Sequence, residues 1–385
     1  MDDERIYYRD GLAVCRVVRE RPPEWMAWDD RLEAWVAPGH RLPELRAWAA
    51  EQDLPEGGPG TEEIGEVLFD PRTPRDYQRT ALERWKAAGG RGSVVLPTGA
   101  GKSFVAVLAI HDGRRGACVV APTRALVSQW FGQLVDAFGP ERVGAFYGEE
   151  KMVRPVTVTT YHSAFTLLER HGERFDLLVL DEVHHLADTA DGEARAWHDA
   201  LRVAPAARRL GLTATYPDGR DDELQSLVGP VAYRRRIGEM VDAELADFAL
   251  ERRFVSLTPE ERRAYDAAED TYRGFIQAAG YPERFGEDTS EWWPLFMSQT
   301  RRSPAARRAF RAYRERERIV AMARAKLSET GRLLRLFPAE RAVLFCGSSD
   351  AAEALSRHFS IPLIRAATPA SERKEILDAL DTGRI

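Results

Sequence analysis

Cysteine, lysine and long hydrophobic runs are scarce in this 385-residue sequence. Its three cysteines, Cys15, Cys118 and Cys346, form no Cys-x-x-Cys pair, which argues against a disulfide framework, a zinc ribbon and an iron–sulfur cluster. Charged residues interrupt every apolar run within about ten residues, which is too short to cross a bilayer. The acidic start lacks an apolar signal core. We therefore expect a cytoplasmic protein with no membrane partner.

Lysine supplies only five of the 55 basic residues, and the formal net charge is −6. A net charge of this sign argues against nonspecific coating of nucleic acid, but it is compatible with a local basic channel. A chain of 385 residues exceeds one compact domain, so we expect two or three.

Residues 1–66 are predicted to form a small α+β domain. Alternating apolar patterns over 5–8 and 12–18 flank Asp10-Gly11, a pair typical of a two-residue hairpin turn. The expected core consists of Trp25, Trp28, Trp35 and Trp48. A turn-rich stretch over 55–60 marks the end of this domain.

Residues 67–235 have the pattern of an α/β domain, because short β-branched runs alternate with helix-length segments and so predict a parallel sheet. The expected strands are Ser93–Leu96, Ala117–Ala121, Val143–Tyr147, Val156–Thr160, Leu177–Leu180 and Leu210–Thr213. Residues 236–385 begin with a helical, arginine-rich region. A strand over Ala342–Cys346 and a helix over 350–359 then predict the start of a second α/β domain.

A glycine-rich loop lies between the first predicted strand of the sheet and a helix. It consists of Pro97, Thr98, Gly99, Ala100, Gly101, Lys102 and Ser103. Glycines let backbone N–H groups approach phosphate oxygens, and the helix N-terminus favours the anion. Lys102 is expected to reach the β- and γ-phosphates of ATP, and the Ser103 hydroxyl to bind Mg²⁺. Leu96 stands where the strict phosphate-loop pattern has its first glycine, a departure common in helicases.

Two carboxylates, Asp181 and Glu182, follow the predicted strand Leu177–Leu180. Parallel strands place ligands at their carboxyl ends. Asp181 is therefore a candidate ligand of Mg²⁺, and Glu182 a candidate to orient and polarise the attacking water. His184 is expected to couple the nucleotide site to neighbouring segments. Upstream, Gln78 and Arg75 are candidates to bind the adenine, the first through its amide and the second by packing on the base.

Hydroxyl-bearing residues follow three more predicted strands. Thr123 with Arg124, and Thr159 with Thr160, are candidates for nucleic-acid phosphate contacts. Thr213 and Thr215 are candidates to couple the nucleotide site to nucleic acid. Each pair taken alone is more often a turn or a helix cap. Their order along the chain, together with the phosphate loop and the Asp-Glu pair, favours the functional interpretation.

This order of motifs resembles that of superfamily 2 helicases, and among them the XPB family of DNA-repair helicases. Residues 6–29 resemble the small damage-recognition domain of that family, and 341–345 and 369–373 resemble later segments. The resemblance implies a RecA-like first helicase domain over 67–235 and an incomplete second one over 236–385, with a thumb-like helical insertion over 258–326. It also implies ATP-driven 3′→5′ movement on DNA, with single-stranded DNA or damaged or junction duplex as the partner, and a nuclease as a candidate protein partner.

Two departures from the family pattern bear on activity. The Arg-Glu-Asp element of the family should fall near 216–220, where only Asp218 is retained. The motifs that supply an arginine finger are absent up to Ile385, so we expect an N-terminal fragment with impaired turnover.

The sequence alone leaves the role of one segment open, and it leaves two other functions open for the chain. The run of arginines over 301–318 forms either a solvated helix face or a DNA contact. The chain could instead be the translocase of a restriction or defence system, although no nuclease motif is visible. It could also be a DNA-binding scaffold that holds nucleotide without turnover.

Overall fold

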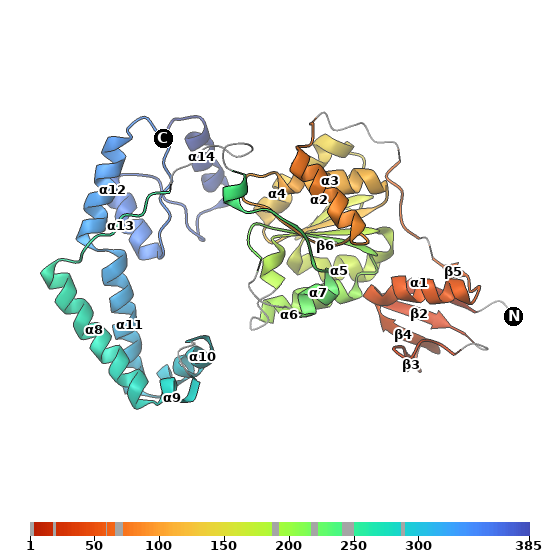
Figure 1. The fold of residues 1–385 in the computed structure, drawn as a ribbon, viewed down its shortest axis with the longest axis horizontal. Helices are drawn as coiled ribbons and strands as arrows, with labels where there is room; N and C mark the ends of the chain where they lie inside the picture. Colours follow the sequence, from red (N-terminus) through yellow and green to blue (C-terminus); the bar gives the residue numbers. More distant parts are fainter. Residues whose placement is uncertain are drawn as a thin grey trace. The chain divides into compact units, whose positions relative to one another are not determined.

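The computed structural model describes residues 4–17, 21–58, 60–65, 72–186, 192–216, 222–240, 250–285 and 289–385. The chain forms two compact units, Met1–Ala249 and Leu250–Ile385 (Figure 1). The domain limits at 66/67 and 235/236 stay predictions. Residues 217–220, where the Arg-Glu-Asp element was expected, lie outside the described residues.

The first sheet is small and mostly antiparallel, in the strand order β3-β4-β2-β1-β5. Its elements are β1 Arg5–Arg9, β2 Leu12–Arg16, β3 Ala27–Asp29, β4 Ala34–Pro38, β5 Glu56–Gly57 and helix α1 Leu42–Glu51. The predicted hairpin is confirmed, with Arg9 opposite Leu12. Asp10 and Gly11 both have positive φ, +47° and +82°, as a two-residue hairpin turn of this kind requires.

The tryptophan core predicted for this sheet is wrong. Small and aliphatic side chains fill the space between the sheet and α1, among them Ala13, Cys15 and Leu45. The side chain of Trp28 is 51% exposed. The other three tryptophans are only partly buried and pack around this core. The centre of this core is therefore filled by smaller side chains, with three of the indole rings at its margin.

The large sheet has the order β13-β6-β12-β11-β7-β10-β8-β9 within the described residues. Its strands are β6 Arg91–Val95, β7 Ala117–Ala121, β8 Val143–Tyr147, β9 Glu150–Lys151, β10 Val156–Thr160, β11 Leu177–Asp181, β12 Arg208–Thr213 and β13 Val231–Arg234. The strands pair in parallel except β9, which runs antiparallel to β8. All six predicted strands are confirmed. The half-exposed edge strand β13 was missed.

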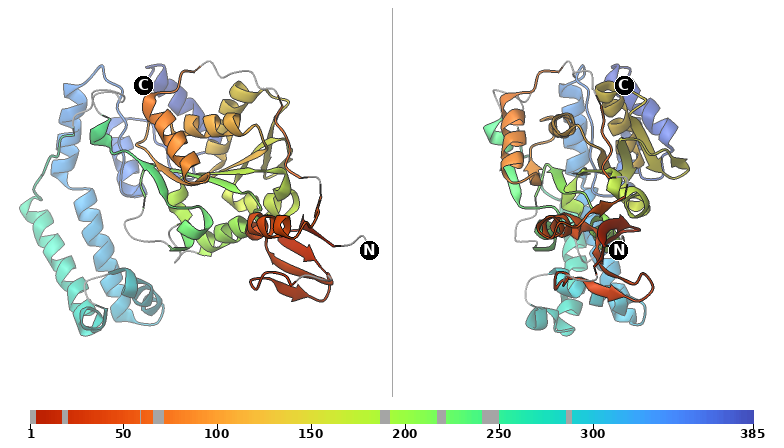
Figure 2. Two further views of the ribbon diagram at one scale, coloured as in Figure 1. Left: turned by 45° about the vertical axis from the view of Figure 1, so that its right-hand side comes forward. Right: turned by 90° about the vertical axis from the view of Figure 1, so that its right-hand side faces the viewer.

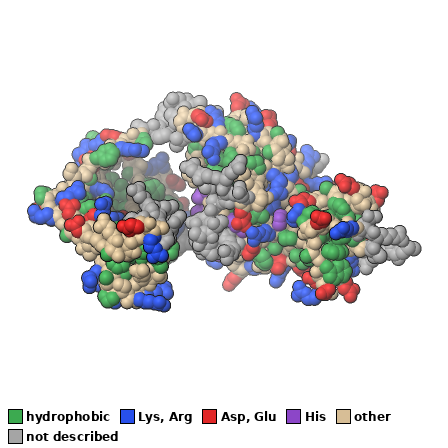
Figure 3. Space-filling view, turned by 60° about the horizontal axis from the view of Figure 1, so that its bottom comes forward, with side chains coloured by type: hydrophobic (Ala, Val, Ile, Leu, Met, Phe, Trp, Pro, Cys, Tyr) green, Lys and Arg blue, Asp and Glu red, His purple; other side chains and the backbone are tan. Residues whose placement is uncertain are grey.

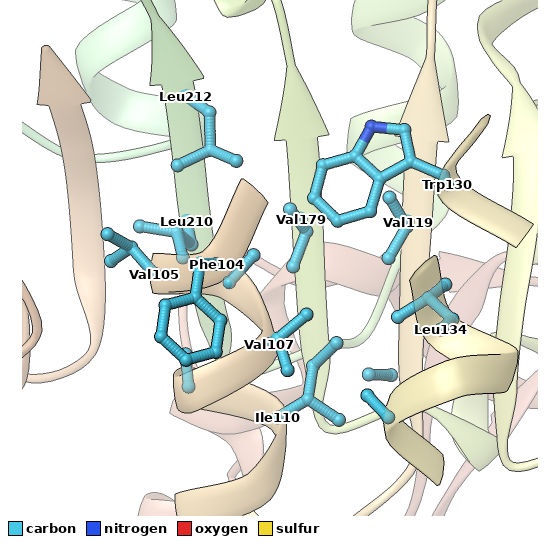
Figure 4. Packing of buried hydrophobic residues seen from close by; sticks show 14 of the residues in the cluster. Phe104, Val105, Val107, Ile110, Val119, Trp130, Leu134, Val179, Leu210 and Leu212 are labelled. Carbon is cyan, nitrogen blue, oxygen red and sulfur yellow. The ribbon is translucent and has the colours of Figure 1, made fainter. Parts of the chain in front are cut away.

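Helices cover both faces of this sheet, as Figures 1 and 2 show. One face is covered by α2 Asp76–Ala87, α3 Lys102–Gly113 and α4 Arg124–Phe138. The other is covered by α5 Tyr161–His171, α6 Gly192–Val203 and α7 Asp222–Leu227. Figure 4 shows the first face, where Phe104 and Ile110 of α3 and Leu134 of α4 lie over the strands. This three-layer sandwich confirms the predicted α/β class.

The small sheet is attached to the large domain through Tyr8. The Tyr8 hydroxyl lies 2.6 Å from the carbonyl oxygen of Leu168 in α5 and 3.0 Å from that of Val203 in α6. At Gly39, a Cβ atom would lie 2.2 Å from the same Val203 oxygen, so only glycine permits this approach. The two sheets are therefore joined by a close, hydrogen-bonded contact.

The second unit is helical in its described residues. Its helices are α8 Pro259–Ala278, α9 Tyr281–Phe285, α10 Thr289–Thr300, α11 Pro304–Ala321, α12 Arg324–Leu336, α13 Ser349–Phe359 and α14 Ala370–Asp381. Helices α8 and α11 lie side by side. Trp292 and Phe296 of α10 are buried in their shared core, so these two rings are not available to stack on bases.

The arginine run lies on α11 from Arg307 onward, and Arg316 and Arg318 pair with acidic side chains. Arg316 bonds to Glu269 of α8 at 2.7 Å, and Arg318 to Glu315 at 2.6 Å. These pairs favour the solvated-face interpretation for this part of the run.

The strand predicted over Ala342–Cys346 does not form. Val343 is 58% exposed and Phe345 is 95% exposed. A buried parallel strand needs neighbouring strands to bond its backbone, and the described residues of this unit contain none. The helix predicted after it is confirmed as α13. In the described part of the chain, no helix is both long and apolar enough to cross a membrane.

Candidate nucleotide site at the carboxyl ends of the large sheet

The large sheet brings all the predicted motifs to one edge. The phosphate loop follows β6, the Thr-Ala-Thr segment follows β12, and the Asp-Glu pair ends β11. The other two hydroxyl-bearing segments follow β7 and β10. These five strands are consecutive neighbours in the sheet, although they are far apart in sequence. Because they are parallel, their carboxyl ends form one continuous edge, where α/β sheets bind ligands.

The phosphate loop has the backbone that its glycines allow. Gly99 and Gly101 have φ of +81° and +71°. Gly101 precedes α3, and no side chain caps the start of that helix. The ammonium group of Lys102 donates to the carbonyl oxygens of Leu96 at 3.2 Å and Pro97 at 3.4 Å. Burial lowers the pKa of Lys102, and the nearby carboxylates of Glu182 and Asp181 oppose that shift.

Gln78 and Tyr77 hold this loop from α2. The Gln78 amide nitrogen donates to the carbonyl oxygens of Ala100 at 3.1 Å and Gly101 at 3.3 Å. Its amide oxygen accepts from the backbone N–H of Arg75 at 2.9 Å. The Tyr77 hydroxyl donates to the same Ala100 oxygen at 2.7 Å. The side-chain amide of Gln78, which was predicted to contact adenine, thus holds the phosphate loop in this structure.

Asp181 is buried at the end of β11, only 9% exposed. Its Oδ2 accepts a hydrogen bond from Nε1 of Trp130 at 2.8 Å, and its Oδ1 from the backbone N–H of Glu182 at 3.1 Å. The Tyr161 hydroxyl donates to its carbonyl oxygen at 3.0 Å. Burial raises the pKa of Asp181, while the Trp130 hydrogen bond and Lys102 lower it. The carboxylate therefore has a fixed orientation.

Glu182 has an unusual backbone for a non-glycine residue, with φ of +51°. Such left-handed conformations cost free energy and concentrate at functional sites. The turn directs the chain into a short helical segment, Val183–Leu186. Oε2 of Glu182 lies 3.3 Å from Nδ1 of His184, and the same Nδ1 lies 2.8 Å from Oγ1 of Thr213. Thr213 donates in turn to the carbonyl oxygen of Thr215 at 2.6 Å.

The predicted nucleic-acid residues separate into two groups. Thr123 and Arg124 are exposed at the start of α4, where the Thr123 hydroxyl caps the helix. Thr159 is fully buried, and its hydroxyl donates to the Phe146 carbonyl oxygen at 2.6 Å. Thr160 is 7% exposed and caps α5. Of the two predicted pairs, only Thr123 and Arg124 are therefore kept as the proposed contact with nucleic acid.

Basic side chains do not gather into one large patch on the face of the molecule drawn in Figure 3. Lys and Arg side chains are interspersed there with Asp and Glu. This distribution agrees with the acidic net charge of −6. Nucleic-acid contact on that face would therefore depend on local groups rather than on bulk charge.

Two residues at the site, Trp130 and Tyr161, were not predicted as site residues. Both bond to Asp181 from helices that follow neighbouring strands. One signal was available for Trp130, because it lies seven residues after Thr123 and so two turns along the same helix face. A tryptophan on a buried face also needs an acceptor for its N–H.

The chain is similar to a known protein family and to several known proteins. A family model described as "Type III restriction enzyme, res subunit" matches residues 72–218. The chain is 29% identical over 364 residues to "DNA 3'-5' translocase XPB2" of Sulfurisphaera tokodaii, covering 93% of this chain and 80% of that protein. It is 29% identical over 334 residues to "DNA 3'-5' helicase XPB" of Mycobacterium tuberculosis, covering 81% of this chain and 50% of that protein.

Among solved structures, "S. cerevisiae Dbp5 bound to RNA and ADP BeF3" has a TM-score of 0.51 at 15% sequence identity. That match covers 82% of this chain and 69% of the Dbp5 chain, and it bears on the fold alone. The large sheet and its covering helices have a RecA-like fold, with the phosphate loop, the Asp-Glu pair and the Thr-Ala-Thr segment at one edge of the sheet. Relatives matched over most of this chain have XPB or Rad25 names.

Proposed function

We propose that this chain is an ATP-dependent DNA translocase or helicase of the XPB type, with Mg²⁺·ATP bound at the edge described above. One observation carries the proposal. The phosphate loop follows β6, Asp181 and Glu182 end β11, and the exposed pair Thr123 and Arg124 follows β7, with only β12 between β6 and β11 in the sheet. The names of the matched relatives support DNA as the polymer on which it acts.

The residues of the loop fit a nucleotide phosphate. A Cβ atom added at Gly101 would lie 2.7 Å from Nε2 of Gln78, so the loop backbone is closely packed from behind by α2. On its other side, the uncapped start of α3 offers backbone N–H groups, which bind anions well. Lys102 would exchange its two carbonyl acceptors for phosphate oxygens.

The carboxylates fit the two other tasks of phosphoryl transfer. Asp181, with Ser103, would hold Mg²⁺, which neutralises charge that develops on the phosphate oxygens when it is bound. Glu182 lies beside it on a separate turn and is about one-third exposed, with a side-chain exposure of 32%. Oε2 of Glu182 lies 3.3 Å from Nδ1 of His184, and the other carboxylate oxygen would orient a water and accept its proton. Arg75 remains the proposed contact for the adenine.

His184, Thr213 and Thr215 would couple these events to DNA. They connect the turn after β11 to the segment after β12 through side-chain hydrogen bonds. A change in the position of Glu182 on hydrolysis would therefore reach the β12 segment. Thr123 and Arg124 would contact DNA phosphates without reading sequence.

The test is phosphate release by this chain, with and without single-stranded DNA. Glu182→Gln removes the proton acceptor and should lower release about a hundredfold or more. Glu150→Gln makes the same chemical change at an exposed position on β9 and serves as the matched control. DNA-stimulated release in wild type and in the control, lost in Glu182→Gln, supports the proposal. Equal release from all three proteins, or wild type that binds no nucleotide, contradicts it.

A further inference from the structure

The only polar atom in the Trp130 side chain, Nε1, bonds to the carboxylate of Asp181. The Trp130 side chain is 3% exposed, and an indole has a single N–H donor and no acceptor. That N–H bonds to Oδ2 of Asp181 at 2.8 Å. Figure 4 shows the ring lying over the sheet, with its nitrogen towards the carboxyl ends of the strands.

The hydrogen bond fixes the plane of the Asp181 carboxylate. One oxygen is held by Trp130 and the other by the backbone N–H of Glu182, at 2.8 and 3.1 Å. Each oxygen keeps further lone pairs for a cation or its waters. Without the indole N–H, the side chain would be held at one oxygen only and could rotate.

Helix α4 connects this bond to the exposed start of the same helix. Trp130 lies seven residues after Thr123, which is about 10 Å along the axis of an α-helix. Val127, Trp130, Leu134 and Phe138 form the buried face of α4. If a helix packed in this way moves as a rigid element, a shift at its first turn would reach the indole.

We propose that Trp130 is a positioning residue that orients Asp181 for Mg²⁺ and connects the DNA-facing start of α4 to the metal carboxylate. This inference rests on the proposed function, because it takes Asp181 as the metal ligand. Partners that orient metal ligands typically contribute tenfold to a hundredfold to metal affinity.

The test compares Trp130→Phe with Trp85→Phe. Trp85 is a matched control, because it is equally buried in the same domain and its N–H bonds to the Arg209 carbonyl oxygen at 2.9 Å, away from the site. The affinity for ATPγS is measured with Mg²⁺ and with EDTA. We expect wild type and Trp85→Phe to gain affinity on adding Mg²⁺, and Trp130→Phe to lose roughly tenfold of that gain while its metal-free affinity is unchanged.

Metal-free affinity also reports that the variants are folded. Single-stranded DNA should raise the Mg²⁺-dependent affinity of wild type and of Trp85→Phe, and raise that of Trp130→Phe less. In an Asp181→Asn background, Trp130→Phe should have no further effect. If Trp130→Phe keeps the full Mg²⁺ gain, the inference fails and the proposed function stands. If wild type itself shows no Mg²⁺ gain, the metal role of Asp181 and the inference fail together.

Discussion

The imidazole of His184 donates a hydrogen bond to the Thr213 hydroxyl across the ends of two neighbouring strands, with Nδ1 2.8 Å from Oγ1. The donor can be assigned from the threonine. Its only hydroxyl proton is directed to the carbonyl oxygen of Thr215 at 2.6 Å, so Oγ1 must accept from the histidine. Nδ1 of His184 therefore carries a proton, and it lies 3.3 Å from Oε2 of Glu182.

Thr213→Val tests whether this contact couples DNA to hydrolysis. Valine keeps the shape of threonine but cannot accept from His184, so the turn after β11 would no longer be connected to β12. We expect nucleotide affinity to be unchanged and DNA stimulation of phosphate release to fall about fivefold or more. Thr213→Ser retains the hydroxyl and should keep most of the stimulation. Full stimulation in the valine variant would rule out a coupling role.

Gly101→Ala tests the backbone of the phosphate loop. The added Cβ would meet Nε2 of Gln78 at 2.7 Å, and φ of +71° is unfavourable for alanine by about 1–2 kcal/mol. We expect lower stability and a loss of ATP affinity, measured by thermal unfolding and nucleotide titration. Gly132→Ala in α4 is the control, because no atom lies within 4 Å of its added Cβ. It should stabilise the protein by up to about 1 kcal/mol with unchanged ATP affinity.

The parallel sheet could be predicted from sequence because its strands are short, buried and β-branched. Their carboxyl ends then had to share an edge, so the motif order alone brought Lys102 and Asp181 to the same side. The order of the strands within the sheet was not predictable from sequence. That order places β11, which ends in the Asp-Glu pair, between β7 and β12. Trp130 was missed for this reason, since its bond depends on β7 and β11 being neighbours.

The errors have physical causes of a similar kind. The apolar run over 342–346 matches a buried strand in sequence, but a strand also needs partners that a local pattern does not reveal. Thr159 and Thr160 follow the same strand-end pattern as Thr123. However, β10 lies between β7 and β8, and Phe146 of β8 accepts the Thr159 hydroxyl inside the domain. Burial, rather than residue type, separates these threonines from an exposed contact.

Arg209 is a buried guanidinium that stabilises the first unit. It is 0% exposed and donates to the carbonyl oxygens of Leu227 at 2.7 Å, Ala204 at 2.7 Å and Leu201 at 3.0 Å. Arg209→Met would remove the Arg209 donor from the Ala204 and Leu201 oxygens, at about 1–3 kcal/mol each, and would leave the Leu227 oxygen with Arg91 at 3.1 Å. We expect a loss of roughly 3 kcal/mol or more in the free energy of unfolding, measured by urea titration.

Arg202→Met is the matched control for this change. The Arg202 side chain is 44% exposed and pairs with Asp199 and Glu223 on the surface, where ion pairs contribute about 0–1 kcal/mol. Its loss should therefore be small. Equal losses of unfolding free energy in the two variants would show that the buried hydrogen bonds of Arg209 stabilise the protein no more than surface ion pairs do.

Acidification should weaken the contact between the small sheet and α6 through His40. This histidine lies in a short helical turn, Gly39–Arg41, with Nδ1 3.1 Å from the Arg202 carbonyl oxygen. Burial lowers the pKa of His40, and the bond to Arg202 opposes that shift only in part. The unfolded chain therefore binds more protons at His40 than the folded protein does. Stability from this group is present above the unfolded pKa and is lost as the pH falls towards the folded one.

We expect the melting temperature of wild type to fall more steeply than that of His40→Gln between about pH 7.5 and about pH 5.5, the range in which histidine titrates. Glutamine can donate to the Arg202 oxygen but takes up no proton in this range. Burial also lowers the pKa of His171 and His184, so both proteins should lose some stability on acidification. His162→Gln removes an exposed histidine and is the control. Parallel curves for wild type and His40→Gln would show that the sheet contact does not depend on the protonation of His40.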